Sequence, residues 1–537
     1  MVPLRHYKKI IFFSAITLVV LGNLFLVTRS NRAISVPQKY LSQEDGIILP
    51  KTLVPTPFAD SLNIIETHFP DRTCNIADYG AVPGGQVKNT QSFAKAISAC
   101  SEQGGGKVVV GPGVWLSGPI RLESNIDLEI QKDATLLFST DFSDYLPPVF
   151  SRFEGVEYYN YAPPIYANNA ENIAITGEGT LNGQGEAWWN FSGNTSIVKL
   201  YAMGESNLPV DHRIFATAKD GLRPSFIEFV NCNRIFLSDV SILRGPMWTI
   251  HPLYSQNIII KNVTVNTAPG PSTDGIVIDS SQNVLVDNAT LSTGDDAIVI
   301  KSGRDNDGRR VNLPSKNIVL QNIIINDAHG AIALGSEMSG NISNVLAQNF
   351  TIANAQYAFR VKSNQQRGGT AENIWIKDLK INSLSEALIQ LDTYYERRVT
   401  GYTNFPPVFR NINIDGVTCK NTIGSINIFG LSENTEAINN LSLRNIAIQK
   451  ARSGMDINDV QGINFENVSI NSKYGPILDV KDSQDVTVSN FTCQNPRLTC
   501  FHIGGINTKH IILDQKNSSL AIEKEVSKNE IITPAAN

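Results

Sequence analysis

The chain has 537 residues, more than one ordinary hydrophobic core needs unless repeating units stack so that each packs only on its neighbours. A formal net charge of -5 excludes a bulk positive field that would recruit nucleic acid or another polyanion, so local cations must hold any anionic ligand. Six cysteines are too few for a disulfide framework at this length, and no Cys-x-x-Cys motif or His-rich tract indicates a metal or a cofactor.

The N-terminus carries an apolar run from Ile10 to Val27, preceded by Arg5, Lys8 and Lys9. We interpret residues 1–32 either as an uncleaved signal-anchor or as a cleaved signal peptide. The preceding cations place the N-terminus in the cytoplasm. Both interpretations predict export of the rest of the chain, to the periplasm or the outside, with residues 10–27 as its only membrane contact.

The next segments lead into the fold. Residues 33–70 contain several prolines and are interpreted as a linker. Residues 89–103 predict an amphipathic helix that ends at three glycines, residues 104–106. A first strand is predicted at residues 107–110. The apolar face of the helix is expected to contain Phe93, Ala96, Ile97 and Cys100.

A rhythm of short β-branched strands fills most of the remaining chain. One unit, an asparagine followed by three mostly apolar residues, recurs at Asn172, Asn257, Asn283, Asn317 and Asn373. Asn, Gly and Ser turns separate such strands at intervals of roughly 20 to 40 residues, which is typical of a β-solenoid. A β-sandwich is the alternative, although tight hairpin signals are scarce. We expect the solenoid over residues 71–520 and a tail over 521–537.

The cysteines allow one local bridge. Cys493 and Cys500 are the best candidates because they are close in sequence, and export would permit the bond. Buried free thiols are an equally good interpretation.

Four polar clusters follow one another in the second half of the chain. They are Ser272-Thr273-Asp274-Gly275, Gly294-Asp295-Asp296, Ala328-His329-Gly330 and Arg360-Val361-Lys362. Alternation along the strands predicts that Asp295, His329, Arg360 and Lys362 share the outward face. Three carboxylates, an imidazole and two cations suit acid-catalysed cleavage of a bond beside an anionic sugar.

Asp274 and Asp296 do not fit this alternation. Parity with the neighbouring isoleucines points both carboxylates into the core, where an unpaired charge is costly. Either the backbone bends at Gly275 and Gly294, which would turn them outward, or the pair is structural.

With these motifs the sequence resembles the polygalacturonase-like glycoside hydrolases of family 28. The family's markers run Asn-Thr-Asp, Gly-Asp-Asp, Gly-His-Gly and Arg-x-Lys, and the likeness spans roughly residues 73–515. The stretches 301–310 and 335–340 resemble the bacterial exo-acting branch. The resemblance implies an all-β, right-handed, single-stranded parallel β-helix with an N-terminal capping helix, acting on a pectic polysaccharide without metal or cofactor. We expect a monomer.

The resemblance also implies roles for the acids. Asp295 would protonate the glycosidic oxygen, while Asp274 and Asp296 would activate the water that inverts the anomeric carbon. Neighbouring carboxylates cannot all ionise easily, which agrees with one of them keeping a proton. His329 would hydrogen-bond into this cluster.

The remaining site residues are substrate-binding candidates. Arg360 and Lys362 would bind a galacturonate carboxylate. Arg304 and Arg309 lie on an inserted loop that would block one end of the groove and favour exo action. Tyr394, with the adjacent Tyr395, is a candidate for stacking on a sugar, although simple aromatic packing at a coil edge is the favoured interpretation.

The sequence departs from the family pattern at Ser272, Ala328 and Val277, which bears on substrate choice. A hydrolase of the same family acting on rhamnogalacturonan or a substituted galacturonan is therefore the closest alternative. A calcium-dependent pectate-lyase-type β-helix and a non-catalytic sugar-binding β-helix are the others.

Overall fold

The computed structural model describes residue 64 and residues 67–191, 193–396, 405–513 and 519–533. The expected signal segment, residues 1–32, and nearly all of the expected linker lie outside these residues. Within the described ranges, no helix is both long and apolar enough to span a bilayer.

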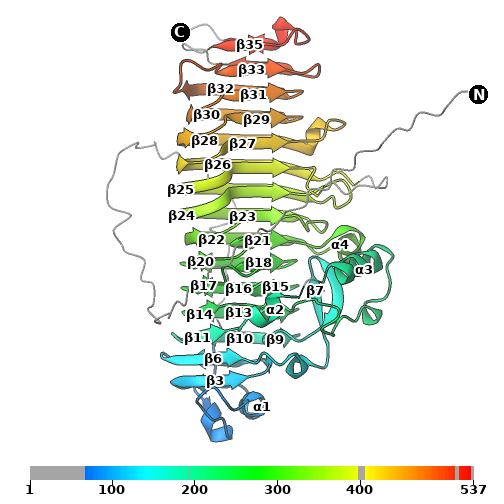
Figure 1. Ribbon diagram of the computed structural model, residues 1–537, viewed down its shortest axis with the longest axis vertical. Coiled ribbons are helices and arrows are strands. Elements are labelled where there is room, and N and C mark those ends of the chain that lie inside the picture. Colours follow the sequence, from blue (N-terminus) through cyan, green and yellow to red (C-terminus); the bar gives the residue numbers. More distant parts are fainter. Residues whose placement is uncertain (1–63, 65–66, 192, 397–404, 514–518, 534–537) are drawn as a thin grey trace, which may run out of the picture. The chain divides into compact units, whose positions relative to one another are not determined.

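Residues 73–532 wind into a right-handed parallel β-helix, as the sequence predicts, and Figure 1 shows the coils stacked in chain order. Three ladders of parallel strands run along the stack. The first ladder contains β1 (Thr73–Asn75), β2 (Gly106–Val110), β5 (Ile126–Ile130), β10 (Glu171–Thr176), β13 (Asn233–Ser238), β16 (Gln256–Lys261), β19 (Gln282–Asp287), β22 (Ser315–Asp327), β24 (Ile342–Lys362), β25 (Thr370–Asp392), β26 (Val408–Asn421), β28 (Ile438–Ala451), β30 (Gln461–Ser472), β32 (Gln484–Cys493), β34 (Lys509–Leu513) and β36 (Ile531–Ile532).

The other two ladders complete each coil. The second ladder contains β3 (Gly113–Ser117), β6 (Ala134–Phe138), β11 (Thr180–Asn182), β14 (Ser241–Leu243), β17 (Thr264–Asn266) and β20 (Thr290–Ser292), and continues into β22. The third ladder contains β4 (Ile120–Arg121), β9 (Ile165–Asn168), β12 (Ile227–Val230), β15 (Ile250–Leu253), β18 (Ile276–Asp279), β21 (Ile298–Lys301), β23 (Gly330–Gly335), the ends of β24 and β25, β27 (Gly424–Phe429), β29 (Met455–Asn458), β31 (Leu478–Lys481), β33 (Phe501–Gly504) and β35 (Leu520–Ile522). The polar clusters lie on this third ladder.

The core is the inside of the coil stack. Alternate residues of each strand point inward, so that Ile276 of β18, Ile298 of β21, Ile332 of β23 and Phe359 of β24 form one continuous buried column. The recurring asparagines lie within the first few residues of first-ladder strands, where the chain turns into the strand. Asn257, for example, has φ of +57°, and its Nδ2 donates to Asn233 Oδ1 in the preceding coil at 2.8 Å. Stacked asparagines therefore satisfy the polar groups of the turns.

The predicted amphipathic helix forms as α1 (Thr90–Glu102) at the N-terminal end of the stack. Its buried side chains are the four expected ones, and they join the solenoid core. The described residues also form short 3-10 helices, of which η3 lies near α1: η3 (Ile76–Tyr79), η4 (Phe142–Tyr145), η5 (Val210–His212), η6 (Thr435–Ala437) and η7 (Lys528–Glu530).

Insertions between the coils gather on one side of the third ladder (Figure 1). They include the antiparallel hairpin of β7 (Val149–Phe153) and β8 (Val156–Asn160), and the helices α2 (Glu186–Trp189), α3 (Asn194–Glu205) and α4 (Asp305–Val311). Apolar side chains of the hairpin and of α3 cover outward-facing residues of β18, β21 and β23, among them Val277, Val299 and Ala333. The insertions therefore form a wall beside the polar clusters.

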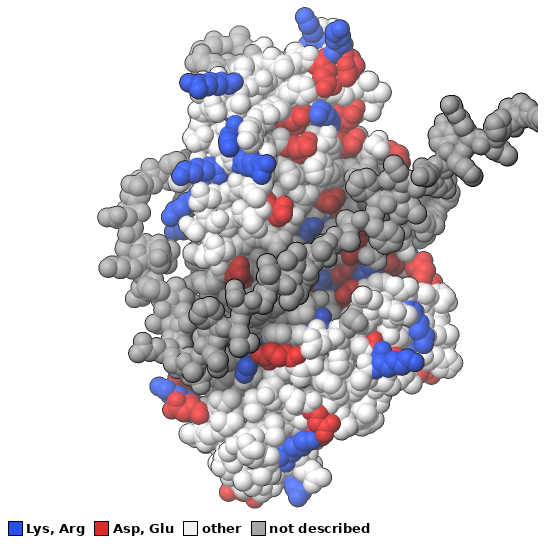
Figure 2. Space-filling view, viewed as in Figure 1, with Lys and Arg blue, Asp and Glu red and all other residues white. Residues whose placement is uncertain are grey.

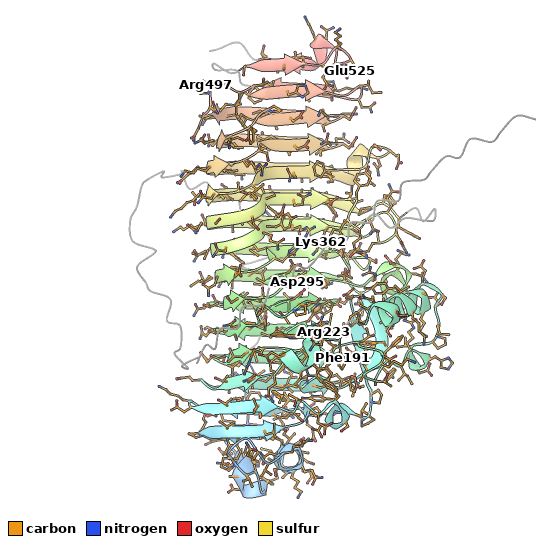
Figure 3. All side chains as sticks on the ribbon, in the orientation of Figure 1. Phe191, Arg223, Asp295, Lys362, Arg497 and Glu525 are labelled. Atoms are coloured by element: carbon orange, nitrogen blue, oxygen red, sulfur yellow. A yellow bond between two sulfur atoms is a disulfide. The ribbon has the colours of Figure 1, made fainter. Side chains whose placement is uncertain are left out.

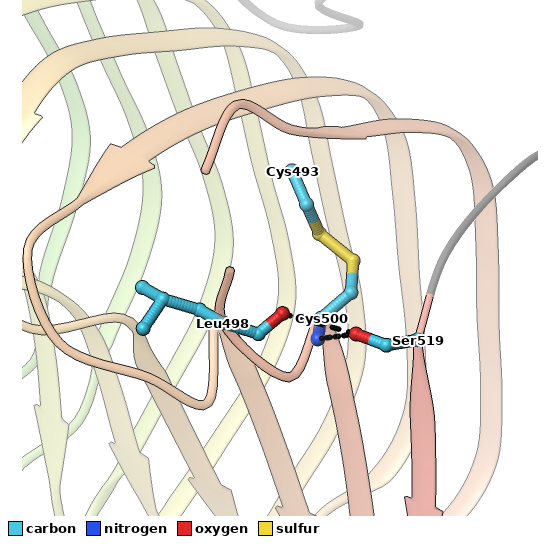
Figure 4. The surroundings of a disulfide bond; sticks show 4 residues. All are labelled: Cys493, Leu498, Cys500 and Ser519. Carbon is cyan, nitrogen blue, oxygen red and sulfur yellow. Dashed lines mark hydrogen bonds between the residues drawn. A yellow bond between two sulfur atoms is a disulfide. The ribbon is translucent and has the colours of Figure 1, made fainter. Parts of the chain in front are cut away.

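The C-terminal boundary differs from the expectation. Strands β35 and β36 pair with β33 and β34, so residues 520–532 form part of the solenoid. The expectation that a tail begins at residue 521 is therefore corrected. The two strands have only three and two residues, too short for a periodic signal. Of the two interpretations left open for Cys493 and Cys500, the structure has the bond, beside the last coils (Figure 4), and the other four cysteines are buried thiols.

Candidate active site

A cleft of about 640 Å³ lies over the third ladder beside the insertions. Coils from β15 to β25 contribute to it, together with the tip of the β7–β8 hairpin. Figure 3 shows Asp295 and Lys362 on the same side of the stack, and the coil of β23 lies between their two levels. The ionisable residues that line it are Glu154, Asp274, Asp295, Asp296, Lys301, Asp327, His329, Glu337, Lys362, Tyr395 and Glu396.

The three predicted acids meet in this cleft because strands begin later than simple alternation assumes. β18 starts at Ile276 and β21 at Ile298, and the residues just before each strand form bends. Asp274 and Asp296 lie in these bends and therefore escape the inward parity of the strands. The backbone thus departs from regular strand geometry at Gly275 and Gly294, and both side chains line the cleft.

Close backbone packing makes glycine necessary at these bends. A Cβ atom on Gly294 would lie 1.9 Å from the carbonyl oxygen of Gly270. A Cβ atom on Gly275 would lie 2.5 Å from the carbonyl oxygen of Ala297. Only a residue without a side chain allows neighbouring coils to approach so closely.

The surroundings of the acids push their pKa values apart. Burial, with the nearby Asp295, raises the pKa of Asp274 well above its usual range. Burial and the adjacent Asp296 raise the pKa of Asp295. Despite its own burial, Asp296 has a lowered pKa because the positive charges of Lys362 and Lys301 lie close to it. The site therefore contains both a carboxyl group that retains its proton and a carboxylate that stays ionised.

The hydrogen bonds of Asp296 agree with its being the ionised carboxylate of the cluster. Lys362 Nζ donates to Asp296 Oδ2 at 3.0 Å. Asp296 Oδ1 is buried and accepts no hydrogen bond from the described residues, so it can accept one from a bound water or hydroxyl. A Cβ atom on Gly330 would lie 2.5 Å from this oxygen, so the glycine after His329 makes room for it.

His329 and Arg360 form the second pair. Arg360 Nη1 donates to His329 Nε2 at 3.0 Å, which makes this ring nitrogen an acceptor. The Arg360 guanidinium also lies over the rings of Tyr357, at 4.4 Å, and Tyr395, at 5.0 Å. Outward parity of His329, Arg360 and Lys362 agrees with their positions, and both cations contact a member of the acid cluster or its imidazole.

The two arginines of the inserted loop have a different place from the expected one. Arg304 is nearly buried, contacts Glu337 and Glu396 at 3.2 Å each, and stacks on Tyr201 at 3.8 Å. Arg309 donates to backbone carbonyls of residues 366 and 367 and stacks on Phe405 at 3.7 Å. Neither lines the cleft, so they fix the wall of insertions rather than offering charge to a ligand.

The tyrosine candidates also separate. Tyr395 lines the cleft and lies over Arg360 and Lys362. The neighbouring Tyr394 does not line it, and its hydroxyl accepts from the backbone N–H of Ser432 at 3.2 Å. The side chains of these two adjacent tyrosines point in different directions after the end of β25. Strand alternation alone could not predict which of them enters the cleft.

Sequence reasoning missed five charged residues of the cleft: Glu154, Lys301, Asp327, Glu337 and Glu396. Lys301 Nζ donates to Glu337 Oε2 at 2.7 Å, and Lys301 also lies 4.9 Å from the ring of Trp248. Three cations, Lys301, Arg367 and Arg304, lower the pKa of Glu337 well below its usual range. Glu154 comes from the hairpin tip. Outward parity with Asp295 was a usable signal for Lys301, whereas the hairpin gave none.

Val277, one of the departures from the family pattern, does not reach the cleft. It is fully buried on the outer face of β18, within a cluster that includes Phe153 and Trp248. Ser272, by contrast, lines the cleft.

Comparisons with known proteins agree with this site. Residues 211–464 match the family described as glycosyl hydrolases family 28. A "probable polygalacturonase" of Vitis vinifera is 29% identical over 407 residues, covering 73% of this chain and 78% of the relative. An "exo-poly-alpha-D-galacturonosidase" of Dickeya chrysanthemi is 28% identical over 66% of this chain, which spans 63% of that relative's length.

Solved structures extend the likeness to three dimensions. The hyperthermoactive exopolygalacturonase of Thermotoga maritima has a TM-score of 0.70 and 34% identity, and the match covers 76% of this chain and 95% of that one. The family 28 exopolygalacturonase of Yersinia enterocolitica shares the fold, with a TM-score of 0.62 and 21% identity over 82% and 78% of the two chains. Together with the acid cluster and its paired cations, these matches show that the chain belongs to the glycosyl hydrolases of family 28.

Proposed function

We propose that the protein hydrolyses the α-1,4-galacturonosidic linkages of polygalacturonate from a chain end, with inversion at the anomeric carbon. The observation that carries this proposal is the pair of adjacent carboxyl groups with opposite pKa shifts, Asp295 raised and Asp296 lowered, in one cleft. An inverting glycosidase needs one acid and one base in this state. The names of the relatives support the pectic substrate.

The residues divide the reaction as follows. Asp295 donates its proton to the glycosidic oxygen as the bond to the anomeric carbon breaks. Asp296, kept ionised by Lys362, takes a proton from the attacking water through its free Oδ1 oxygen. Asp274, whose pKa is raised further, keeps its proton and orients the water by a hydrogen bond. Asp296 then releases the proton it took from the water to solvent, and Asp295 takes one up from solvent, which restores both groups.

Two cations remain close enough to the reacting groups to bind the sugar acid. Lys362 and Arg360 each make one hydrogen bond to the acid cluster or its histidine and have further N–H groups; Lys362 lines the cleft, whereas Arg360 reaches it only through His329 and Tyr395. Tyr395 lies beside both and offers an aromatic face at the same level of the cleft. We assign these three residues to a galacturonate carboxylate and its ring.

Exo action follows from the wall of insertions. The backbone N–H of Arg304 donates to the carbonyl of Gly155 at 2.9 Å, which joins the hairpin tip to the start of α4. The charged side of this wall carries Glu154, Glu337 and Glu396. A continuing polygalacturonate chain would bring its own carboxylates against these acids, so the wall suits the end of the chain.

Product analysis tests the proposal directly. With polygalacturonate and a chelator, we expect saturated monogalacturonate as the first product and no absorbance from unsaturated ends. Asp295→Asn is expected to lower kcat at least about a thousandfold, whereas Asp287→Asn, a matched change on the outer turn of β19, should leave it unchanged. Monogalacturonate that fails to appear, products that absorb in the ultraviolet, or hydrolysis of rhamnogalacturonan alone would each contradict it.

We also propose that the solenoid is exported and held at the membrane by residues 10–27. The apolar run after a basic segment supports this, as does the bond between Cys493 and Cys500, since disulfides persist in oxidising compartments. Fractionation of cells expressing the full chain is expected to place activity with the membranes. Deletion of residues 1–32 should move the protein to the cytoplasm, and activity in the soluble extracellular fraction from the full chain would contradict the anchor.

A further inference from the structure

One residue of the cleft has a backbone conformation that its side chain disfavours. Phe153 and Val156 close the β7–β8 hairpin, and the two residues between them have φ of +43° at Glu154 and +83° at Gly155. Such two-residue loops favour Asn-Gly or Asp-Gly. The second loop position, residue 155, requires glycine because a Cβ atom there would lie 2.6 Å from the backbone nitrogen of Arg304. Glutamate in the first position therefore has a conformational cost, which its contacts must explain.

The hairpin presents this residue rigidly. Arg152 Nη1 donates to Asp279 Oδ1 of β18 at 2.9 Å, and both side chains are fully buried. Ser151 Oγ donates to Glu228 Oε1 of β12 at 2.8 Å. These contacts attach β7 to the outer face of the third ladder. The carbonyl of Gly155 is fixed to α4 as described above, so the tip has a defined place over the cleft.

The carboxyl group of Glu154 faces the cleft, with about 30% of the side chain exposed. Tyr201 of α3 donates its hydroxyl to Glu154 Oε2. Arg304 Nη1 lies 3.7 Å from the same oxygen, but Arg304 also contacts Glu337 and Glu396. Lys301 also contacts Glu337 at 2.7 Å, and Arg367 contacts Glu396 at 3.1 Å. The wall thus sets three cations against three acids, and each of these cations is already paired with a carboxylate. The acceptor oxygens of the wall suit hydroxyl groups.

We propose that Glu154 determines which chain end the enzyme accepts: its carboxyl group hydrogen-bonds the C4 hydroxyl of the non-reducing terminal galacturonate, and its place in the wall excludes a further anionic unit. The C4 oxygen is where the chain would continue, so a group that reads a free hydroxyl there also recognises the end. The inference rests on the proposed exo-hydrolysis. Glu154 is then a specificity residue, distinct from the acids that transfer protons.

End-modified substrates test the contact. Two trigalacturonates with reduced alditol ends are compared, one intact and one with a 4,5-unsaturated non-reducing unit, which lacks the C4 hydroxyl. We expect the wild-type enzyme to prefer the intact substrate by about 10- to 100-fold in kcat/KM, the effect of one hydrogen bond to a charged group. Glu154→Ala should reduce the preference below about threefold, and Glu154→Gln should keep most of it. Glu186→Gln, an exposed acid paired with Arg244, is the matched control and should behave as wild type.

A stability measurement separates recognition from a structural role. Glu154→Asn creates the favoured Asn-Gly loop with a side chain too short to reach the substrate, so we expect Tm to hold or rise while the preference is lost. A lower Tm with the preference intact would overturn the proposal, as would a wild-type enzyme that accepts both substrates equally. If wild-type enzyme released no monogalacturonate from polygalacturonate, the proposed function itself would fail. If wild-type enzyme released monogalacturonate normally but Glu154→Ala kept the full preference for the intact substrate, only the role of Glu154 would be refuted.

Discussion

At the scale of single residues, the cations of the cleft have two tasks. Lys362 and Arg360 were predicted as ligands of a sugar carboxylate, and each also contacts a member of the acid cluster or its histidine. Lys301 is bound to Glu337. The cations therefore set the protonation of the site before substrate arrives, so binding and acid strength are coupled through the same side chains.

The pH dependence of hydrolysis should report this coupling. Activity needs ionised Asp296 and protonated Asp295, so kcat should fall as pH drops through the lowered pKa of Asp296 and again as pH rises through the raised pKa of Asp295. Lys362→Met removes the main positive neighbour of Asp296, so we expect the acid limb to move to higher pH in addition to a higher KM. Lys380→Met, an exposed change on β25, serves as the control. An acid limb unchanged in Lys362→Met would contradict this prediction.

The Lys301–Glu337 pair should contribute strongly to stability. Glu337→Gln leaves Lys301, Arg304 and Arg367 around a neutral amide, and we expect a loss of about 3–5 kcal/mol in the free energy of unfolding. Because the pKa of Glu337 is lowered in the folded state, the contribution is present above its unfolded pKa and disappears as pH falls through the folded value.

Urea denaturation at pH 7 and at acid pH measures both effects. The control is Glu372→Gln, which breaks the exposed pair with Arg410 and should cost less than about 1 kcal/mol. Equal losses in the two variants would show that burial of the Glu337 cluster adds no stability.

The sequence identified these residues unevenly for physical reasons. Asp295, His329, Arg360 and Lys362 were found because strand alternation fixes the face of a side chain from its neighbours. Glu154 could not be found because its position depends on a hairpin that docks against strands far away in sequence. The arginines of α4 were placed on the right loop, but charge alone did not reveal that acids and tyrosines of the wall already bind Arg304.

At the scale of elements, the late start of β18 and β21 decides whether the acids meet. The alternative of a structural Asp pair required the strands to extend back through Asp274 and Asp296. Glycine just beside each acid instead allows a bend in which coils touch through bare backbone. The glycines can be read from the sequence. The bend, however, depends on how closely the backbone of the neighbouring coil approaches them, which a local sequence pattern does not reveal.

Gly294→Ala tests the bend. The new methyl group would overlap the carbonyl oxygen of Gly270, so the turn carrying Asp295 must shift. We expect a loss of about 1–3 kcal/mol in stability and at least a tenfold drop in kcat, since small displacements of catalytic groups are costly. Gly111→Ala, whose Cβ would meet only a side-chain atom at 3.8 Å, is the matched control for thermal unfolding and activity. Wild-type kcat in Gly294→Ala would rule out a precise role for this turn.

At the scale of the whole molecule, stability should be a sum over stacked coils. Ile323 and Ile324 are neighbours on β22, with 1% and 42% of their surfaces exposed. Ile323→Ala opens a cavity between coils and should cost about 2–5 kcal/mol, whereas Ile324→Ala should stay within about 0.5 kcal/mol. Denaturant unfolding measures the difference. Similar losses would mean that the two faces of the strand are not distinguished by packing.

The fold was predictable at this scale because one coil repeats. Each coil carries the same asparagine turn and apolar alternation, so errors in single strands do not change the architecture. The last coil was missed because β35 and β36 are too short to show any period, and their pairing comes from the stack beneath them. Acidic side chains gather on one side of these C-terminal coils, with a few basic side chains among them (Figure 2).

The helix α1 has a consequence for the molecule in a crowded solution. A stack of parallel strands has two open ends, and each presents unpaired N–H and C=O groups on which another copy could continue the ladder. α1 packs its apolar face against the first coil, and at the other end the strands shrink to two and three residues. In the part of the chain that the structure describes, both ends are thereby poor templates on which a second copy could extend the ladder.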